Sequence, residues 1–299
     1  MTDSPIIETV ELTKTYGSVR AIDGLNFSVP QGSICGLLGR NGAGKTTTLK
    51  VLLGMARPTS GAARVFGLDA GNREASVAIR QRCAFVSEDK DLYDSMTTGE
   101  IVRFAAGLYP RWRADLEQRY QTAFALASHA SIKQLSRGAR TRLALLLALC
   151  SGAELLLLDE PTSGLDPAAN EELLQLLVTH AGREGATIVL SSHHLADIEQ
   201  IADRIAIVDR GRAVVQGALD DIHERYCRVQ LVFDGPAPET ALSTPGIVGV
   251  KRDGRVLRVL SSAGSERLVA EARALKPVAV DVAPVTLKEI FLETVAVEI

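Results

Sequence analysis

The sequence predicts an α/β core with an antiparallel β-subdomain and a helical insertion, followed by a small α+β domain. Short apolar runs, bounded by glycine or charged residues, occupy 33–39, 154–160 and 186–192, as is typical of buried strands. Segments of helical period lie between these runs, which favours a mainly parallel sheet. From about residue 222 the pattern changes to strands around one helix. The 299 residues suffice for a mid-sized domain and an appendage.

The elements of the first domain follow in order along residues 1–221. Residues 6–16 and 19–30 alternate apolar and polar side chains, which predicts antiparallel strands. The buried run at 33–39 leads into a glycine-rich loop and then a helix. Further helices are expected at 140–150 and 168–182, and a helical subdomain at about 97–140. The chain after the domain, 222–299, shows strand-like stretches and one helix at 265–275.

Composition and charge exclude several classes of function. The formal net charge is −3, and Lys and Arg are scattered, so a nucleic-acid partner is not expected. The N-terminal residues lack the basic start and apolar middle of a secretory signal, and no aliphatic run reaches the roughly 20 residues of a membrane helix. We therefore expect a cytoplasmic protein. Its widely spaced cysteines are expected to be buried, reduced thiols: Cys35, Cys83, Cys150 and Cys227.

Residues 39–46 read GRNGAGKT, which fits the phosphate-binding pattern G-x-x-x-x-G-K-[ST] between a strand and a helix. Glycines at three positions let backbone N–H groups curl around phosphate where a Cβ would clash. Lys45 is expected to reach the β- and γ-phosphates, and the Thr46 hydroxyl to hold Mg²⁺. The alternative is a plain surface turn. The predicted loop residues are Gly39, Arg40, Asn41, Gly42, Ala43, Gly44, Lys45, Thr46 and Thr47.

Two carboxylates end the buried run LLLLDE. Asp159 and Glu160 are expected at the carboxyl end of this strand, where ligands bind in open α/β sheets. Asp159 would orient Mg²⁺, and Glu160 would act as general base for the attacking water. The alternative is that both carboxylates cap the next helix. With the phosphate loop, they predict a P-loop NTPase core.

The chain resembles the ATP-binding subunit of ABC transporters of the bacterial export type. Five motifs carry this resemblance, in this order along the chain: GRNGAGKT, LSRGA (135–139), LLLLDE, SGLD (163–166) and SSHH (191–194). The resemblance covers about 6–220. It implies the cofactors ATP and Mg²⁺, and a head-to-tail homodimer or heterodimer that drives a separate membrane permease. Contact with the inner face of the cell membrane would be peripheral and made through the permease.

The resemblance also implies roles for individual residues. Tyr16 matches the aromatic residue that stacks on adenine, although it also suits an ordinary strand. The loop LSRGA, made of Leu135, Ser136, Arg137, Gly138 and Ala139, matches the signature that contacts the γ-phosphate of ATP on the opposite subunit. Leu135 is expected to open a helix there.

Three further positions matter to turnover. Asp166 matches a loop that communicates across the dimer, and His193 matches the histidine that contacts the γ-phosphate. Its neighbour His194 is assigned no role, since adjacent strand residues face opposite sides and a zinc pair is disfavoured. Glu88 stands where the family has Gln and is expected to ligate Mg²⁺ through water.

The sequence departs from the family at this position and in its signature, where Arg137 replaces a Gly and Ala139 replaces the Gln. A degenerate site is therefore an alternative. Segment 88–98 lies where the family contacts its permease, and its four acidic residues would complement a basic helix or form a solvated loop. Two other functions compete: a non-transport ABC-type ATPase, which commonly carries coiled-coil or zinc insertions, and a nucleotide-sensing regulator, which needs no catalytic base.

Overall fold

The computed structural model describes residues 5–239 and 242–295 of the chain. It divides into two compact units, Met1–Ala213 and Val214–Ile299. The sequence places the boundary at about 222, whereas the division falls inside a strand, β10 (Arg212–Ala218). Each unit has a hydrophobic core of its own.

An antiparallel sheet occupies the N-terminal part of the first unit. Its strand order is β2-β1-β4-β5, and β1 pairs with β2 from Ile7↔Val29 to Tyr16↔Val19. The alternation of apolar and polar residues predicted this hairpin, because one face of the sheet is buried and the other is exposed. The strands are β1 (Ile7–Tyr16), β2 (Val19–Val29), β4 (Ser60–Val65) and β5 (Leu68–Asp69).

A six-stranded sheet forms the centre of the first unit, in the order β10-β9-β3-β8-β7-β6. From β9 to β6 neighbouring strands run parallel. Every residue of β3, β7 and β8 is buried, as expected for strands covered on both faces. The bounds are β3 (Ile34–Leu38), β6 (Cys83–Val86), β7 (Leu155–Asp159), β8 (Thr187–Ser192) and β9 (Arg204–Asp209).

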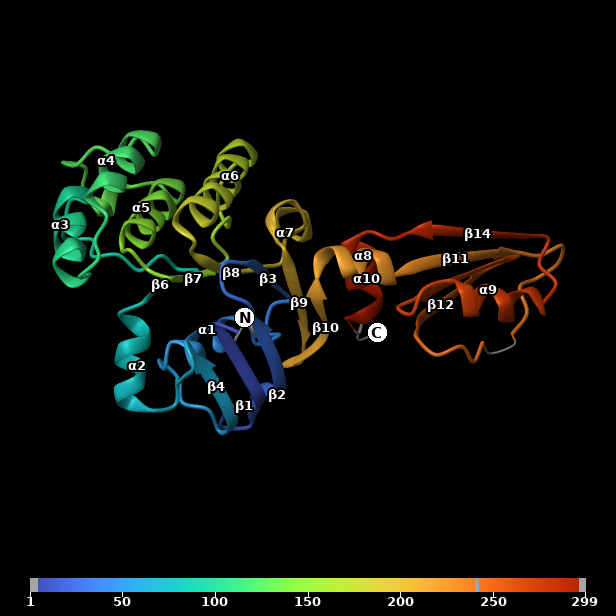
Figure 1. Ribbon diagram of the computed structural model, residues 1–299. Coiled ribbons are helices and arrows are strands. Elements are labelled where there is room, and N and C mark those ends of the chain that lie inside the picture. Colours follow the sequence, from blue (N-terminus) through green and yellow to red (C-terminus); the bar gives the residue numbers. More distant parts are fainter. Residues whose placement is uncertain (1–4, 240–241, 296–299) are drawn as a thin grey trace. The chain divides into compact units, whose positions relative to one another are not determined.

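Helices cover this sheet, and α3 to α6 lie together on one side of it (Figure 1). The signature helix starts at Arg137 with Ser136 as its N-cap, so the expected start at Leu135 is wrong. Leu135 instead ends a short 3₁₀ turn, Ile132–Gln134. The helices are α1 (Lys45–Leu52), α2 (Arg73–Arg80), α3 (Thr98–Leu108), α4 (Ala114–Ala123), α5 (Arg137–Cys150), α6 (Pro167–Glu184) and α7 (Leu195–Ile201).

The core between the two sheets joins their apolar faces. Ile7, Leu12 and Leu25 of the antiparallel sheet belong to the same buried cluster as Leu37 and Leu157 of the parallel sheet. Burial of such side chains is the main source of folding free energy, about 25 cal/mol per Å². This packing fixes strand β3, and with it the loop that follows.

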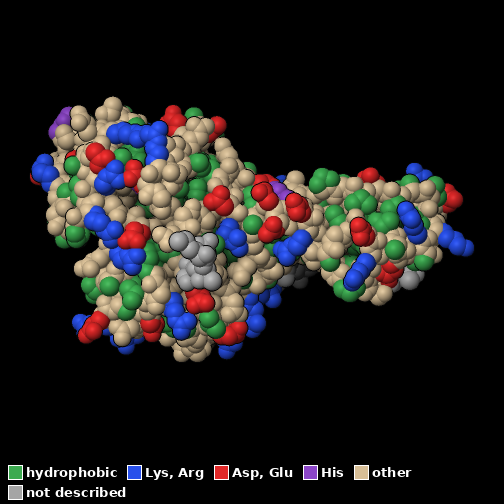
Figure 2. Space-filling model, viewed as in Figure 1, with side chains coloured by type: hydrophobic (Ala, Val, Ile, Leu, Met, Phe, Trp, Pro, Cys, Tyr) green, Lys and Arg blue, Asp and Glu red, His purple; other side chains and the backbone are tan. Residues whose placement is uncertain are grey.

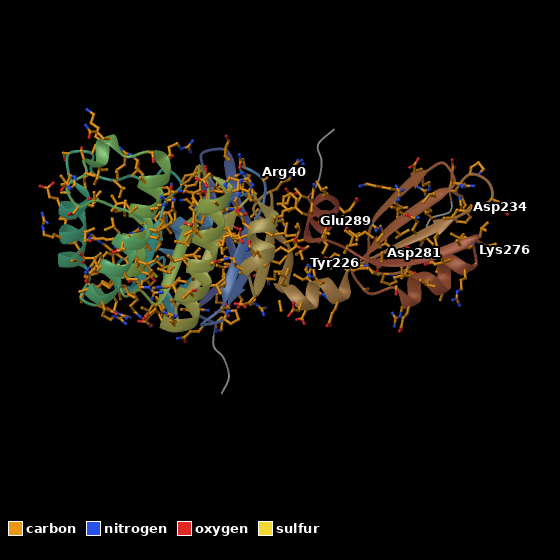
Figure 3. The ribbon with its side chains drawn as sticks, turned by 90° about the horizontal axis from the view of Figure 1, so that it is seen from above. Arg40, Tyr226, Asp234, Lys276, Asp281 and Glu289 are labelled. Carbon is orange, nitrogen blue, oxygen red and sulfur yellow. The ribbon has the colours of Figure 1, made fainter. Side chains whose placement is uncertain are left out.

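The second unit is a four-stranded antiparallel sheet, β12-β13-β11-β14, with α9 packed on one face. The expectation of a single helix here is wrong, because α8 and α10 are also helical. α10 carries a complete capping box at Thr286 and Glu289, and Figure 3 labels Glu289 there and Asp281 on β14. The elements are α8 (Leu219–Arg225), β11 (Cys227–Val232), β12 (Ile247–Asp253), β13 (Val256–Ser261), α9 (Glu266–Arg273), β14 (Ala279–Pro284) and α10 (Leu287–Thr294).

Three of the four cysteines are buried, and Cys227 is half-buried. Burial raises the pKa of the Cys35, Cys83 and Cys150 thiols to about 12, so these remain protonated and unreactive. Basic and acidic side chains are interspersed over the face that Figure 2 shows. Among the described residues, no helix is both long and apolar enough to cross a membrane.

Candidate functional site

Four loops meet at one edge of the parallel sheet. Strands β3, β6, β7 and β8 run parallel, so their carboxyl ends lie at the same edge. They are followed by the phosphate loop, by Glu88, by Asp159 and Glu160, and by His193. The topology therefore brings together residues that are separated by as many as 150 positions in sequence.

The glycines of the phosphate loop satisfy two different constraints. Gly44 has φ +103°, and a Cβ there would lie 2.3 Å from the Ala21 carbonyl oxygen. At Gly39 a Cβ would lie 2.5 Å from the carbonyl oxygen of Val208. At Gly42 no protein atom lies within 4 Å of a Cβ, and its φ of +81° is the feature that requires glycine there.

A cavity of about 370 Å³ opens over this loop. It is lined by loop residues, by the start of β2 and by two acidic residues from other strands, Glu88 and Glu160. The structure thus places Glu88 beside the loop, as expected. The lining residues of the loop are Arg40, Asn41, Gly42, Ala43, Gly44, Lys45, Thr46 and Thr47.

Lys45 lies almost wholly inside the protein, at 6% exposure. Its ammonium donates to the carbonyl oxygens of Gly39, at 2.7 Å, and Arg40, at 3.4 Å. It also lies 3.4 Å from a carboxylate oxygen of Glu160. The loop therefore curls around its own lysine and holds a positive charge at the cavity floor.

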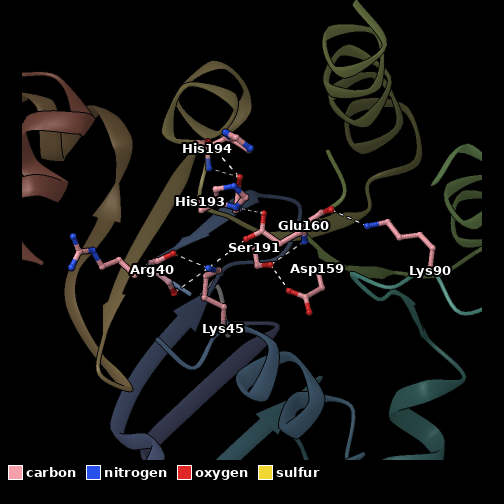
Figure 4. Close-up of polar contacts among 10 residues, drawn as sticks. Arg40, Lys45, Lys90, Asp159, Glu160, Ser191, His193 and His194 are labelled. Carbon is pink, nitrogen blue, oxygen red and sulfur yellow. Dashed lines mark hydrogen bonds and ion pairs between the residues drawn. The ribbon is translucent and has the colours of Figure 1, made fainter. Parts of the chain in front are cut away.

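Glu160 connects the loop to strand β8 (Figure 4). One carboxylate oxygen faces Lys45, and the other lies 2.8 Å from Nδ1 of His193. Glu160 is 4% exposed and has φ +47°, a left-handed conformation that is uncommon for a non-glycine residue. Its amide donates to the Ser191 hydroxyl at 3.1 Å. The carboxylate is thus held between a cation and an imidazole.

Asp159 ends strand β7 and is 1% exposed. One oxygen accepts a hydrogen bond from the Ser191 hydroxyl at 2.5 Å. The other oxygen has no hydrogen-bond partner among the residues that the structure describes. A buried, unsatisfied carboxylate oxygen is costly unless a ligand occupies it, so the site fits a hard cation such as Mg²⁺.

The structure places the remaining predicted residues outside this cavity. Tyr16 ends β1, is 49% exposed, and has the Lys14 ammonium 4.6 Å from its ring centroid. The Ser136 hydroxyl accepts from the Ala139 amide, and the Asp166 carboxylate accepts from the Ala169 amide, so both cap helices. None of them touches the phosphate loop of its own chain.

A second, polar cavity lies beside the signature. Its lining includes Arg137, Glu88 and Lys90. Arg137 also lies against the SGLD loop, where a Cβ on Gly164 would meet its guanidinium at 3.3 Å. The Arg that replaces a signature Gly therefore packs on the neighbouring motif. Gly138 has Leu165 of the same motif nearby.

Two residues of the site were missed by sequence reasoning. Ser191 bonds both Asp159 and the Glu160 amide, and its place in SSHH was an available signal. Lys90 is 6% exposed and donates to the Glu160 carbonyl oxygen at 2.9 Å. Burial lowers the pKa of Lys90, and the neighbouring acidic residues oppose that shift. No signal marked it among the acidic residues around it.

The argument against pairing His193 with His194 is wrong. Strand β8 ends at Ser192, so the two histidines follow the strand, and their ring centroids lie only 4.0 Å apart. Even so, the described residues contain no cluster of three or more His, Cys, Asp or Glu placed to hold a metal.

An apolar groove of about 230 Å³ lies between β6, α3 and α5. Tyr93, Phe104 and Leu108 line it and are all exposed, and the Tyr93 and Phe104 rings meet edge-on with centroids 6.0 Å apart. Lys90 also lines the groove. Of the four acidic residues expected to face a partner here, Glu88 faces the phosphate cavity and Asp94 pairs with Arg140.

Comparisons with known proteins show which family this chain belongs to. A family profile described as ABC transporter matches residues 22–163. The bacitracin transport ATP-binding protein BcrA of Bacillus licheniformis is 36% identical over 233 residues, 76% of each chain. The chain belongs to the ABC transporter family. A solved structure described as the ATP binding subunit of an ABC transporter superposes with TM-score 0.65 at 32% identity, over 73% of this chain and 92% of that one.

Another member of the ABC transporter family is longer. The probable multidrug ABC transporter ATP-binding protein YbhF of Escherichia coli is 40% identical over 223 residues, 73% of this chain. The chain spans only 38% of the length of YbhF.

Proposed function

We propose that this chain binds and hydrolyses ATP to drive export by a separate membrane permease, at the cytoplasmic face of the membrane. The observation that carries this proposal is the cluster of Lys45, Glu160 and His193 at one sheet edge, over a phosphate-binding loop. A cation for phosphate, a carboxylate able to accept a proton and an imidazole beside it form the set that hydrolysis needs.

The residues have separate tasks in this proposal. The loop amides and the N-terminus of α1 receive the phosphates, since unpaired N–H groups and the helix dipole favour anions. Lys45 exchanges its contact with Glu160 for the β- and γ-phosphates. This exchange frees the Glu160 carboxylate to accept a proton from water, while His193 lies beside it to contact the γ-phosphate.

Asp159, with its unsatisfied oxygen, and the Thr46 hydroxyl at the start of α1 would hold Mg²⁺. When bound, the ion neutralises charge on the phosphate oxygens. Glu88 lines the same cavity and is proposed to act through water.

We expect Glu88→Gln to raise the Mg²⁺ concentration for half-maximal hydrolysis several-fold and to leave ATP binding intact. The substitution removes one negative charge from the surroundings of the metal. The interaction energy of a single charge with a nearby ion in water is about 1 kcal/mol. Titration of phosphate release against Mg²⁺ measures the shift. Asp89→Asn is the matched control, because the adjacent exposed residue does not line the phosphate cavity. Coincident titrations for Glu88→Gln and the native protein would place Glu88 outside the metal's field.

Ser136, Gly138 and Asp166 are proposed to act across a dimer interface, with Tyr16 on adenine. Ser136 and Asp166 cap helices and leave the phosphate loop of their own chain untouched. Free helix N-termini can receive an anion held by another subunit. The proposal therefore includes two chains arranged head to tail, either identical or different.

The apolar groove is proposed as the docking surface for the permease. Its large exposed side chains, Tyr93, Phe104 and Leu108, suit the apolar face of a helix. The carboxylate of Asp91, which also lines the groove, suits a basic residue on that helix. The second unit, 214–299, holds no motif of the site and is proposed to act in dimer contacts or regulation.

We expect Phe104→Asp to weaken copurification of the membrane partner by roughly 10-fold or more, because a charge replaces an aromatic contact in the groove. Quantification of the partner that accompanies the chain from solubilised membranes measures this loss. Val178→Asp on α6 is the matched control, since Val178 is 43% exposed against 45% for Phe104. Equal partner yields for the two variants would remove the groove from the proposal.

A further inference from the structure

Lys90 occupies an unusual position for a lysine in a loop. It follows strand β6 in a segment whose neighbours, Glu88, Asp89 and Asp91, are exposed or half-exposed acidic residues, yet it is itself 6% exposed. Burial of an ammonium is costly unless it is paired and hydrogen-bonded. Its φ of +50° adds backbone strain. A residue that carries both costs is expected to make a specific contact.

That contact is with the backbone of the proposed catalytic residue. The Lys90 ammonium donates to the Glu160 carbonyl oxygen at 2.9 Å, as Figure 4 shows. Glu160 is also in the left-handed conformation, with φ +47°. On its other side, the Glu160 amide donates to the hydroxyl and to the carbonyl oxygen of Ser191. Both polar groups of the Glu160 peptide backbone are therefore fixed by hydrogen bonds.

The direction of the Glu160 side chain depends on this backbone. In the left-handed conformation the side chain leaves the strand at a different angle from a regular β residue. Here that angle brings the carboxylate to Lys45 on one side and His193 on the other. A charge-assisted hydrogen bond to the carbonyl is roughly twice as strong as a neutral one and opposes relaxation to an unstrained φ.

We propose that Lys90 is a positioning residue for hydrolysis, and that its ammonium holds the Glu160 backbone so that the carboxylate faces the phosphate loop. The inference rests on the proposed role of Glu160 as general base. The same side chain lines the apolar groove, so the contact joins the proposed permease surface to the backbone of Glu160.

The test uses Lys90→Met, which keeps an unbranched side chain of similar length without the charge. We expect kcat to fall by roughly 10- to 100-fold, as is usual when a catalytic group is displaced by about an ångström. KM for ATP and the ATP dissociation constant are expected to stay within about 2-fold, since Lys90 does not line the phosphate cavity. Lys90→Arg should restore most of kcat. Lys288→Met, on an exposed lysine of α10, is the control.

A double-mutant cycle with Glu160→Gln separates positioning from other roles. Residues that act through one another have non-additive effects, so Lys90→Met should slow the residual single-turnover rate of Glu160→Gln by less than about 2-fold. Native kcat in Lys90→Met would overturn the inference while the proposed function stands. Full additivity, or a loss of ATP affinity that matches the loss of kcat, would overturn it as well. A native rate in Glu160→Gln alone would instead remove the general base, and with it both proposals.

Discussion

Lys45→Ala is expected to lower the affinity for ATP by roughly 10- to 100-fold and to reduce hydrolysis to background. A hydrogen bond to a charged group is worth about 1.5–3 kcal/mol, and each 1.4 kcal/mol is a factor of ten in affinity. The loss affects hydrolysis further, because Lys45 lies 3.4 Å from Glu160 and serves the phosphate charge that develops in the transition state. Titration with a fluorescent nucleotide and a phosphate-release assay measure the two effects.

Lys50→Ala is the matched control for this variant. Lys50 lies on the same helix, α1, but is exposed and does not line the cavity. Thermal unfolding of both variants checks that the helix is intact. If Lys45→Ala folds and keeps native affinity and turnover, the loop after β3 is not the phosphate site.

The parts of the fold that the sequence predicted are those in which local and tertiary preferences agree. The run of four leucines that ends at Asp159 is wholly buried. A short apolar run between polar residues is typical of a buried strand. The phosphate loop was also predicted from its sequence. Glycine is required at Gly39 and Gly44 because backbone carbonyl oxygens lie too close for a Cβ, so the local sequence agrees with the tertiary contacts.

The features that escaped prediction depend on contacts distant in sequence. In the sequence, Lys90 is one charged residue in a polar loop. It is buried because strand β7 brings Glu160, which is 70 positions away in the sequence, beside it. The left-handed backbone of Glu160 also has no signature in its own side chain.

Within one chain the proposed site has a base, a phosphate loop and residues for a metal, but Ser136 and Gly138 do not line the cavity over the loop. Hydrolysis in the proposed mechanism therefore depends on a second chain that closes over the nucleotide. Removal of the base without loss of ATP binding offers a way to observe that second chain.

Glu160→Gln is expected to slow ATP hydrolysis by roughly 10²- to 10⁴-fold, the usual contribution of a general base. Glutamine keeps the size and most hydrogen bonds of the side chain but cannot accept the proton of the attacking water. ATP binding should survive, because Lys45, Thr46 and the loop amides supply those contacts. Single-turnover phosphate release measures the rate. Glu154→Gln serves as control, since Glu154 precedes the same strand and pairs with Arg82 and Arg111, away from the site.

The same variant is expected to form a stable dimer with Mg-ATP and to remain a monomer with ADP. A ligand that binds only the closed dimer stabilises it by mass action, and unhydrolysed ATP persists at the interface. Size-exclusion chromatography with light scattering, with and without Mg²⁺, measures the assembly. A native hydrolysis rate would end the catalytic role of Glu160. An inactive variant that binds ATP and stays monomeric, alone and with the permease present, would keep the base but remove Ser136 and Gly138 as ligands across the interface.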